Sequence, residues 1–197
     1  MERKITREQF YQESLKLFFE KGYKATSMRT IAQRLNIQAA TLYNYVKSKE
    51  ALLEVLLFDI ADRFHAGMKD IQASSYSPIE KLKSLVSLNV RLTVERPYAV
   101  SMLINEWKNL QEVKREKFLA NRNSYESMLR EIIAEGIDCG ELRPMNLDLA
   151  LEAILSSIRW LFTWYSRESG QAPNPIELEK QMTDFILHGV SASPSNA

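Results

Sequence analysis

Apolar residues recur every three or four positions along almost the whole 197-residue chain, and this helical period constrains the fold more than any other feature. Segments that alternate apolar and polar residues, as half-buried strands do, are missing, and so are the dipeptides that close two-residue hairpins. Capping residues, glycines and prolines separate the helical segments. The sequence therefore predicts an all-α fold of about nine helices.

The first fifty residues contain three short helical segments. A capping box formed by Thr6 and Gln9 begins the first segment. The second ends at Asn36, a residue type that tolerates the left-handed backbone of a tight turn, and the third covers residues 38–46. Two short helices joined in this way have the spacing of a helix-turn-helix, whose second helix enters the major groove of DNA. We therefore expect residues 1–50 to form a DNA-binding domain.

Longer helical segments follow. Ser48 is positioned to cap a helix that we expect to close near Gly67, and Ser77 with Glu80 forms a second capping box. A short polar tail, residues 191–197, is expected to be disordered. The remaining helices are expected at residues 78–95, 97–107, 111–136, 146–165 and 175–188.

Positive charge is concentrated at the amino-terminal end. Residues 1–50 contain ten lysines and arginines against five glutamates, whereas the other 147 residues contain 16 basic and 20 acidic side chains. The overall charge of +1 would by itself argue against a nucleic-acid partner. Because the basic excess lies in one segment, we expect that segment alone to meet a polyanion.

Composition excludes several other classes of protein. No apolar run approaches the length of a membrane span, and charged residues occupy the amino terminus, where a signal peptide would need an apolar core. We therefore expect a cytoplasmic protein without a membrane partner. A single cysteine, Cys139, excludes an intrachain disulfide, and with two histidines the chain lacks the ligand spacing of zinc sites. No cofactor is expected.

The third helical segment has one apolar and one polar side. Leu42 and Val46 are expected to face inward, which turns small and polar side chains outward. Alanines on that outward side allow close approach to the bases, and Thr41 and Asn44 can pair with base edges. Phenols and lysines beside them can reach phosphates, and one lysine lies at the amino end of the next helix, where backbone N–H groups attract a phosphate. These flanking residues are Tyr43, Tyr45, Lys47 and Lys49.

The stretch LFFEKGYKATSMRTIAQRLNIQAATLYNYVKSKEALLEVL, residues 17–56, resembles without a gap the DNA-binding domain of the tetracycline-repressor (TetR) family. The resemblance makes residues 26–35 the first helix of the motif and residues 38–46 the recognition helix. It departs from the family at Asn36, where Gly is usual, and at Gln38, where Ser or Thr usually caps the helix. The second departure leaves Gln38 as a candidate base reader.

The same resemblance has implications for the sites and the assembly. It places Thr26 on a phosphate, as it does several of the flanking residues named above. The family implies an all-helical homodimer that binds double-stranded operator DNA. It also implies a ligand-binding and dimerisation domain, here residues 51–190, whose ligand relieves repression. The predicted DNA-binding residues are Thr26, Arg29, Gln38, Ala39, Ala40, Thr41, Tyr43, Asn44, Tyr45, Lys47 and Lys49.

Polar side chains interrupt apolar stripes in the carboxy-terminal part of the chain. Arg122 lies one turn after Phe118, and Arg159 lies between Leu155 and Phe162. Burial of such a charge is costly unless it is paired. Two explanations stay open: the arginines pair with glutamates or reach the surface, or one of them meets the anionic end of a ligand. The predicted pocket residues are Asn89, Met102, Trp107, Arg122, Tyr125, Met128, Arg159 and Phe162.

The segments SSIRWLFTWYSRESG and ELEKQMTDFILHGV resemble, more loosely, TetR-family regulators of fatty-acid and sterol degradation that respond to acyl-CoA thioesters. This resemblance implies a small hydrophobic effector, for which an acyl-CoA is one candidate. The alternative is a regulator of an efflux pump or other operon that senses a drug-like aromatic or cationic ligand. Such a ligand would require carboxylates such as Glu106 beside aromatic side chains.

The last two long helices are predicted to form the dimer contact. Two copies of this pair would give a four-helix interface. Trp160 and Trp164 fit either that interface or the ligand pocket. The predicted interface residues are Leu147, Leu151, Ile154, Ile158, Leu161, Phe185 and Ile186.

Two rival functions are weaker. A small helical enzyme would need paired carboxylates, a phosphate loop, or a nucleophile with a base, and none of these is evident; Cys139 has no activating neighbour in the sequence. A protein that binds DNA without sequence preference would carry basic charge well beyond the first fifty residues. The sequence therefore predicts a ligand-responsive, sequence-specific transcriptional regulator rather than an enzyme.

Overall fold

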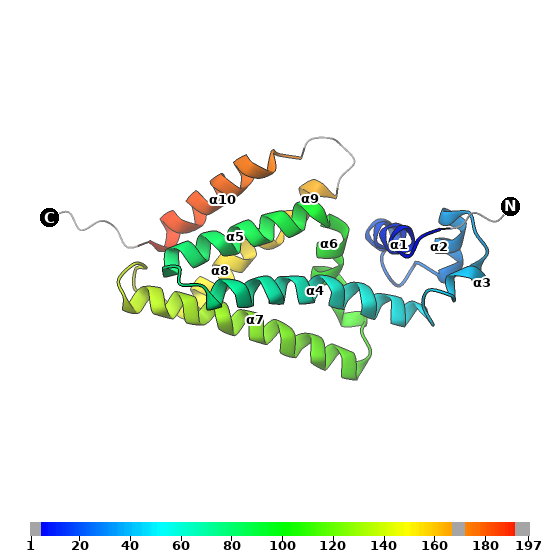
Figure 1. Ribbon diagram of the computed structural model, residues 1–197, viewed down its shortest axis with the longest axis horizontal. Helices are drawn as coiled ribbons and strands as arrows, with labels where there is room; N and C mark the ends of the chain where they lie inside the picture. Colours follow the sequence, from blue (N-terminus) through cyan, green and yellow to red (C-terminus); the bar gives the residue numbers. More distant parts are fainter. Residues whose placement is uncertain (1–4, 167–171, 192–197) are drawn as a thin grey trace. The chain divides into compact units, whose positions relative to one another are not determined.

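The computed structural model describes residues 5–166 and 172–191, so residues 192–197 of the predicted tail lie outside the described part. Within it the regular structure is helical, apart from an isolated bridge between Leu142 and Ser191, which confirms the all-α prediction. The helices (Figure 1) are α1 (Arg7–Lys21), α2 (Met28–Leu35), α3 (Ala39–Leu42), α4 (Lys49–Ala73), α5 (Pro78–Glu95), α6 (Pro97–Asn105), the 3₁₀ helix η1 (Trp107–Asn109), α7 (Glu112–Asp138), α8 (Leu147–Arg159), α9 (Phe162–Tyr165) and α10 (Pro175–Val190).

Contacts between residues divide the chain into two compact units. The first comprises Met1–Ala61 with Tyr98–Leu119, and the second comprises Asp62–Pro97 with Ala120–Ala197. Helices α4 and α7 each contribute residues to both units. The predicted boundary at residue 50 divides a DNA-binding part from a ligand-binding part, whereas the two units are defined by contacts between residues. The functional boundary stays a prediction.

The first unit has a core built from its short helices. Phe10, Leu17 and Phe18 of α1, Ile31 of α2 and Leu42 of α3 are almost completely buried. Helix α2 packs on both α1 and α3. The apolar positions of each helix recur at helical spacing, so one side of every helix is covered while the other carries polar residues.

Helix α2 has well-defined ends. The Ser27 hydroxyl accepts a hydrogen bond from the Thr30 N–H at 3.1 Å, which caps the amino end. At the carboxyl end Asn36 adopts φ 55° and ψ 48°, and its N–H donates to the carbonyl oxygen of Gln33. The N–H of Ile37 donates to the carbonyl oxygen of Ala32, which completes a Schellman motif. The turn predicted at Asn36 is therefore present.

The predicted third helix, residues 38–46, is shorter than expected. The α-helical part is Ala39–Leu42, and Tyr43, Asn44 and Tyr45 continue it as turns in which each N–H bonds to the carbonyl three residues earlier. Gln38 makes no side-chain capping bond, so the amino end of the helix lacks the support that Ser or Thr would give.

The fourth helix does not close near Gly67, as the sequence suggested, but continues to Ala73. A Cβ atom at Gly67 would lie 2.6 Å from Leu88 Cδ1, so the glycine allows α4 to approach α5 closely. Ser48 caps α4 as predicted, since its hydroxyl accepts a bond from the Ala51 N–H at 3.1 Å.

The helix predicted over residues 146–165 is interrupted. Helix α8 ends at Arg159, Trp160 and Leu161 form a turn, and α9 follows. Nine helical segments were expected, and this break divides one of them. No glycine or proline marks the position, and the apolar pattern continues across it, so periodicity could not indicate the break.

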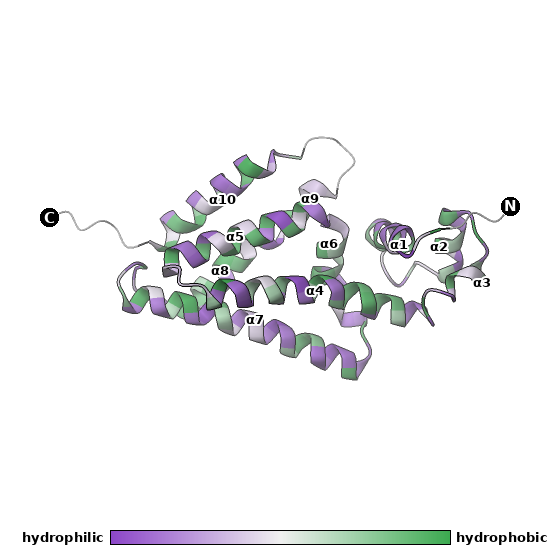
Figure 2. Ribbon diagram, in the orientation of Figure 1, coloured by the Kyte–Doolittle hydropathy of each residue, from purple (hydrophilic) through white to green (hydrophobic). Residues whose placement is uncertain are grey.

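The second unit is arranged around α5. Helices α8, α9 and α10 contact α5, and α10 also packs on α8. The capping box of Ser77 and Glu80 is formed as predicted at the start of α5. Hydrophilic and hydrophobic residues alternate along α4, α5 and α7 in Figure 2, as expected of helices that bury one side.

We predict that Asn36→Ala lowers the free energy of unfolding by about 1 kcal/mol, because alanine disfavours the left-handed backbone of the α2–α3 turn. Asn36→Gly should be neutral or stabilising, since glycine adopts this conformation freely. Urea unfolding of the two variants measures the difference, with Gln33→Ala on the exposed side of α2 as the control. Equal stability of the alanine and glycine variants would contradict the explanation.

Candidate nucleic-acid interface and effector site

Helix α3 is held to the protein core on one side only. Leu42 has no exposed surface, and Val46, after the following turn, is also buried, as the sequence predicted. The opposite side is accessible, and Tyr43 is 54% exposed there. The predicted DNA-binding residues that are exposed are Arg29, Gln38, Ala40, Tyr43, Asn44 and Lys47, and those of intermediate exposure are Ala39, Thr41, Tyr45 and Lys49.

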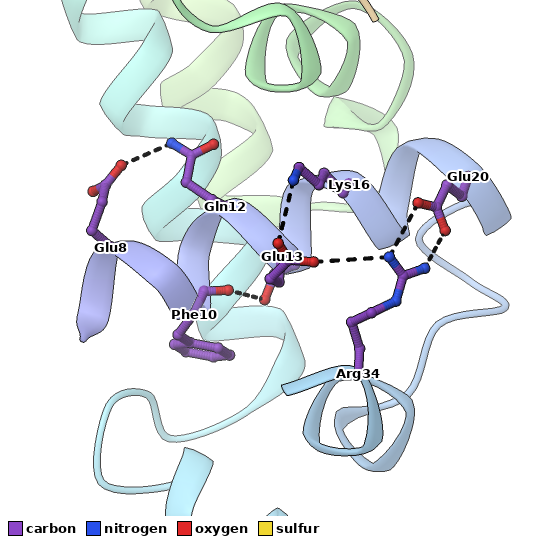
Figure 3. A network of polar contacts seen from close by, with 8 residues as sticks. Glu8, Phe10, Gln12, Glu13, Lys16, Glu20 and Arg34 are labelled. Atoms are coloured by element: carbon purple, nitrogen blue, oxygen red, sulfur yellow. Dashed lines mark hydrogen bonds and ion pairs between the residues drawn. The ribbon is translucent and has the colours of Figure 1, made fainter. Parts of the chain in front are cut away.

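Ion pairs fix the orientation of α2 against α1 (Figure 3). The Arg34 guanidinium pairs with Glu20 and lies 3.8 Å from Glu13 Oε2, while Lys16 pairs with the other oxygen of Glu13 at 3.3 Å. These side chains are more than a quarter exposed, so water screens the attraction and its contribution to stability is small. The way α2 lies on α1 therefore depends mainly on their buried apolar side chains, and the pairs join the two helices at the surface.

Lys49 is engaged inside the protein. Its Nζ donates hydrogen bonds to the carbonyl oxygens of Tyr23 at 2.9 Å and Thr26 at 2.8 Å, and it lies 4.3 Å from the centroid of the Tyr23 ring. Thr26 is buried, and its hydroxyl donates to the carbonyl oxygen of Gly22 at 2.9 Å. These bonds close the loop between α1 and α2. The polar groups of Lys49 and Thr26 therefore have structural partners.

Tyr45 also has a structural contact. Its hydroxyl donates to the carbonyl oxygen of Ile5 at 2.7 Å, and its ring lies 5.7 Å from that of Phe10. The residue thus ties the segment before α1 to the turn after α3. Its phenol is committed to this bond in the present structure.

Sequence reasoning missed a contact between α6–η1 and the α1–α2 loop within the first unit. The N–H of Tyr23 donates to Glu106 Oε1 at 3.3 Å, and Asn109 Nδ2 donates to Glu106 Oε2 at 2.6 Å. Burial raises the pKa of Tyr23 to about 12, and the nearby carboxylates of Glu50 and Glu106 add to the shift. Tyr23 and Glu106 are 83 residues apart, so no local pattern could have linked them.

The arginines of the predicted pocket share one carboxylate in the second unit. Arg122 Nε lies 2.9 Å from Glu126 Oε1, and Arg159 Nη2 lies 3.2 Å from the same oxygen. Arg159 Nη1 is 3.7 Å from Glu152 Oε2, which is too long for a hydrogen bond. Of the two explanations left open by the sequence, pairing with glutamates therefore describes this structure.

Tyr125 and Asn89 lie together in the second unit. Asn89 Nδ2 donates to the Tyr125 hydroxyl at 3.2 Å, and the Tyr125 ring stands edge-on to Phe64 at 6.5 Å. Burial raises the pKa of Tyr125 to about 12, although the bond from Asn89 and the charge of Arg159 act in the opposite direction. The phenol is therefore neutral at physiological pH, and it is placed near Arg159.

The other predicted pocket residues differ in place and exposure. Met128 is buried and Phe162 is of intermediate exposure, both in the second unit. Met102 and Trp107 belong to the first unit, where the Trp107 ring stacks on Phe118 at 6.1 Å. Six of the eight predicted residues thus belong to the second unit.

The predicted dimer residues are mostly covered within the subunit. Leu147 on α8 is of intermediate exposure, and Phe185 on α10 is 69% exposed. The predicted residues that are buried in the second unit are Leu151, Ile154, Ile158, Leu161 and Ile186. The large apolar side chains exposed in the same part of the chain are Leu149, Trp160, Ile176 and Phe185.

Residues 5–166 and 172–191 bring together no group of three or more metal-ligating side chains. None of the helices in those same ranges combines the length and hydropathy that a membrane span requires.

We predict that Lys49→Met lowers the free energy of unfolding by about 2 kcal/mol, because two carbonyl groups lose a charged donor. Lys47→Met, two residues away and exposed, is the matched control and should change stability by less than about 0.5 kcal/mol. Urea unfolding measures both. The structural role of Lys49 would be refuted if the two variants were equally stable.

Two family models match the chain. The model described as bacterial regulatory proteins, tetR family, matches residues 11–56, and the model described as tetracyclin repressor-like, C-terminal domain, matches residues 75–190. The second match alone covers more than half of the chain.

Similar proteins cover nearly the full length. The transcriptional repressor KstR2 of Mycolicibacterium smegmatis is 29% identical over 189 residues, 95% of this chain and 91% of that protein. The structure of the ketosteroid regulator KstR2 of Mycobacterium tuberculosis superposes with a TM-score of 0.88 at 24% identity and covers 95% of both chains. AibR, solved with isovaleryl coenzyme A and operator DNA, gives 0.77 at 21% identity and covers 94% of this chain and 97% of its own. The chain therefore belongs to the TetR family, and it is a ligand-responsive DNA-binding transcriptional regulator, not an enzyme.

Proposed function

We propose that this protein is a cytoplasmic repressor that binds a palindromic operator as a homodimer and is released by a small hydrophobic effector with an anionic end. The observation that carries the effector class is that Arg122 and Arg159, on two different helices, converge on one carboxylate oxygen. An acyl-CoA is the leading candidate, because it joins an apolar chain to several anionic phosphates.

The proposed DNA interface is the exposed side of α3 and of the turn after it. Gln38 and Asn44 carry amides that pair with adenine edges, while Ala40 keeps the helix surface low enough for close approach. Arg29 and Lys47 are exposed and basic, so they suit phosphates. In a dimer, two such helices would read half-sites about 34–36 Å apart.

Three residues of the original set are left out of this interface. The hydroxyls of Thr26 and Tyr45 donate their single protons within the protein, and Lys49 Nζ uses two of its three N–H groups there. We propose that these residues hold the α1–α2 loop and the segment before α1, so that the exposed side of α3 is presented in one orientation.

Asn44→Ala should weaken operator binding about tenfold, because one good amide–base pairing is worth about 1–3 kcal/mol. Binding to unrelated DNA should hardly change, since that binding depends on phosphates. Titration of labelled operator and of a scrambled duplex at fixed salt measures both affinities. Asn123→Ala, an exposed asparagine on α7, is the control. A variant that loses affinity equally for both duplexes would remove Asn44 from the base-reading set.

The proposed effector has an apolar part as well as an anionic end. Met128, Tyr125 and Phe162 belong to the same unit as Arg122 and Arg159, and Tyr125 lies close enough to Arg159 to feel its charge. Acyl-CoA binding has a precedent in this fold, since AibR was solved with isovaleryl coenzyme A. The KstR2 structure is described as that of a ketosteroid regulator, which also points to a hydrophobic effector class.

A cationic, drug-like effector is the second candidate, and the carboxylates available to it are occupied. Both oxygens of Glu106 accept hydrogen bonds, one from Tyr23 and one from Asn109. Glu126 is held by two guanidinium groups. Glu126 is therefore already paired with positive charge, and a cation at Glu106 would have to share its oxygens with two other donors, so the anionic effector is the better match.

A dimer through α8 and α10 would cover the apolar side chains that the second unit leaves exposed. Leu149 and Trp160 lie on and directly after α8, and Ile176 and Phe185 lie on α10. These two helices contact each other, so one continuous face can meet its copy in a second subunit. The buried stripe of α8, which includes the predicted interface residues Leu151, Ile154 and Ile158, would then support this face from within.

Arg159→Met should raise the acyl-CoA concentration needed for half-release of the operator about tenfold, because the effector's anionic end loses a charged partner. Arg130→Met is the matched control: Arg130 lies on α7 and pairs with Asp148 instead. Fluorescence anisotropy of labelled operator, titrated with long-chain acyl-CoAs and separately with free fatty acids, gives the ligand concentration at half-release for each protein. Release that is insensitive to both substitutions would exclude Arg159 from the effector site.

A further inference from the structure

Glu126 occupies an unusual electrostatic position. Its Oε1 accepts hydrogen bonds from Arg122 and Arg159 at once, at 2.9 Å and 3.2 Å, and its side chain is 19% exposed. Guanidinium groups keep their protons in proteins, so Arg122 and Arg159 stay charged at every pH, and their side chains, 38% and 36% exposed, are partly hydrated. Glu126 is the anion that the folded chain itself supplies.

One carboxylate does not neutralise two guanidinium groups. The next carboxylate, Glu152, is 3.7 Å from Arg159 and its side chain is 56% exposed, so water weakens its effect. Arg122 uses only Nε on Glu126, so this bond leaves the Nη1 and Nη2 edge of its guanidinium unused. The site therefore keeps a positive excess and bidentate donor geometry, which suits a phosphate or carboxylate.

We propose that Glu126 is an internal counter-ion that an anionic effector displaces: the effector's phosphate or carboxylate takes over Arg122 and Arg159, and the Glu126 side chain is released from them. This inference rests on the proposed effector site and states how effector binding at that site is regulated. The carboxylate competes with the effector, so it lowers effector affinity and sets the concentration at which the protein responds.

Displacement has a consequence for ligand selection. A neutral hydrophobic molecule offers Arg122 and Arg159 no charged acceptor, so it does not compete with Glu126 for them. An anionic molecule that binds elsewhere in the second unit would leave the Glu126 pairs intact. The proposed exchange therefore restricts the response to ligands whose anion reaches α7 and α8 together.

The test compares Glu126→Gln with wild type, using inorganic pyrophosphate as a probe that has anionic charge and no acyl chain. Glutamine keeps the size and an acceptor oxygen but removes the charge. We expect pyrophosphate to bind the variant about tenfold more tightly than the wild type, measured by calorimetry at constant ionic strength. Because the basic amino-terminal segment also attracts anions, the informative quantity is the difference between proteins.

Two further variants test whether the gain in pyrophosphate affinity comes from Glu126 and depends on Arg159. Glu131→Gln removes a carboxylate from the same helix, where it is exposed and bonds to Gln72 rather than to an arginine, and its pyrophosphate affinity should equal that of the wild type. The double variant Glu126→Gln/Arg159→Met should not show the tighter pyrophosphate binding expected of Glu126→Gln alone. Equal or weaker pyrophosphate binding by Glu126→Gln would overturn the proposal, because Glu126 would then be a support for the arginines and not a competitor.

A second measurement separates this inference from the identity of the effector. With acyl-CoA, Glu126→Gln should release operator DNA at about one tenth of the wild-type concentration. If pyrophosphate binding improves as expected but acyl-CoA releases neither protein, the exchange at Glu126 stands and the acyl-CoA proposal fails. If acyl-CoA releases both proteins at the same concentration, the exchange is refuted and the effector class stands.

Discussion

The burial of Leu42 decides how this protein can meet DNA. Helix α3 has only four residues, too few to be stable alone, and its one fully buried side chain holds it against α2. Since Leu42 points inward, Gln38 and Asn44 are turned toward solvent. The rest of the amino-terminal part supports this arrangement: the Asn36 turn fixes the angle between α2 and α3, and α2 packs on α1 through buried apolar side chains.

Some polar side chains near the helix-turn-helix motif bond to the protein backbone, and others face the solvent. A lysine at the amino end of a helix looks like a phosphate contact in the sequence, yet Lys49 bridges two backbone carbonyls, because the loop that begins at Tyr23 must satisfy its own polar groups once folded. Lys47 has the same chemistry and is exposed. The difference lies in the path of the loop between α1 and α2, which no local pattern of residues specifies.

Much of the fold could be read from local chemistry, while contacts between distant segments could not. The capping boxes at Ser77 and at Thr6 and the left-handed turn at Asn36 each depend on a few neighbouring residues, and all three are present. Gly67 was misread as a helix end because its close approach to Leu88 is a tertiary contact. The bond between Tyr23 and Glu106 was missed for the same reason.

The arginines of the second unit show why polar interruptions in an apolar stripe are ambiguous in a sequence. An ion pair and a ligand site use the same residues, because both satisfy a charge that water cannot fully reach. In the exchange that we propose at Glu126 the two uses are linked by competition: the stronger the internal pair, the more effector is needed to break it. In this proposal, a carboxylate with two guanidinium partners sets effector affinity without touching the bound effector.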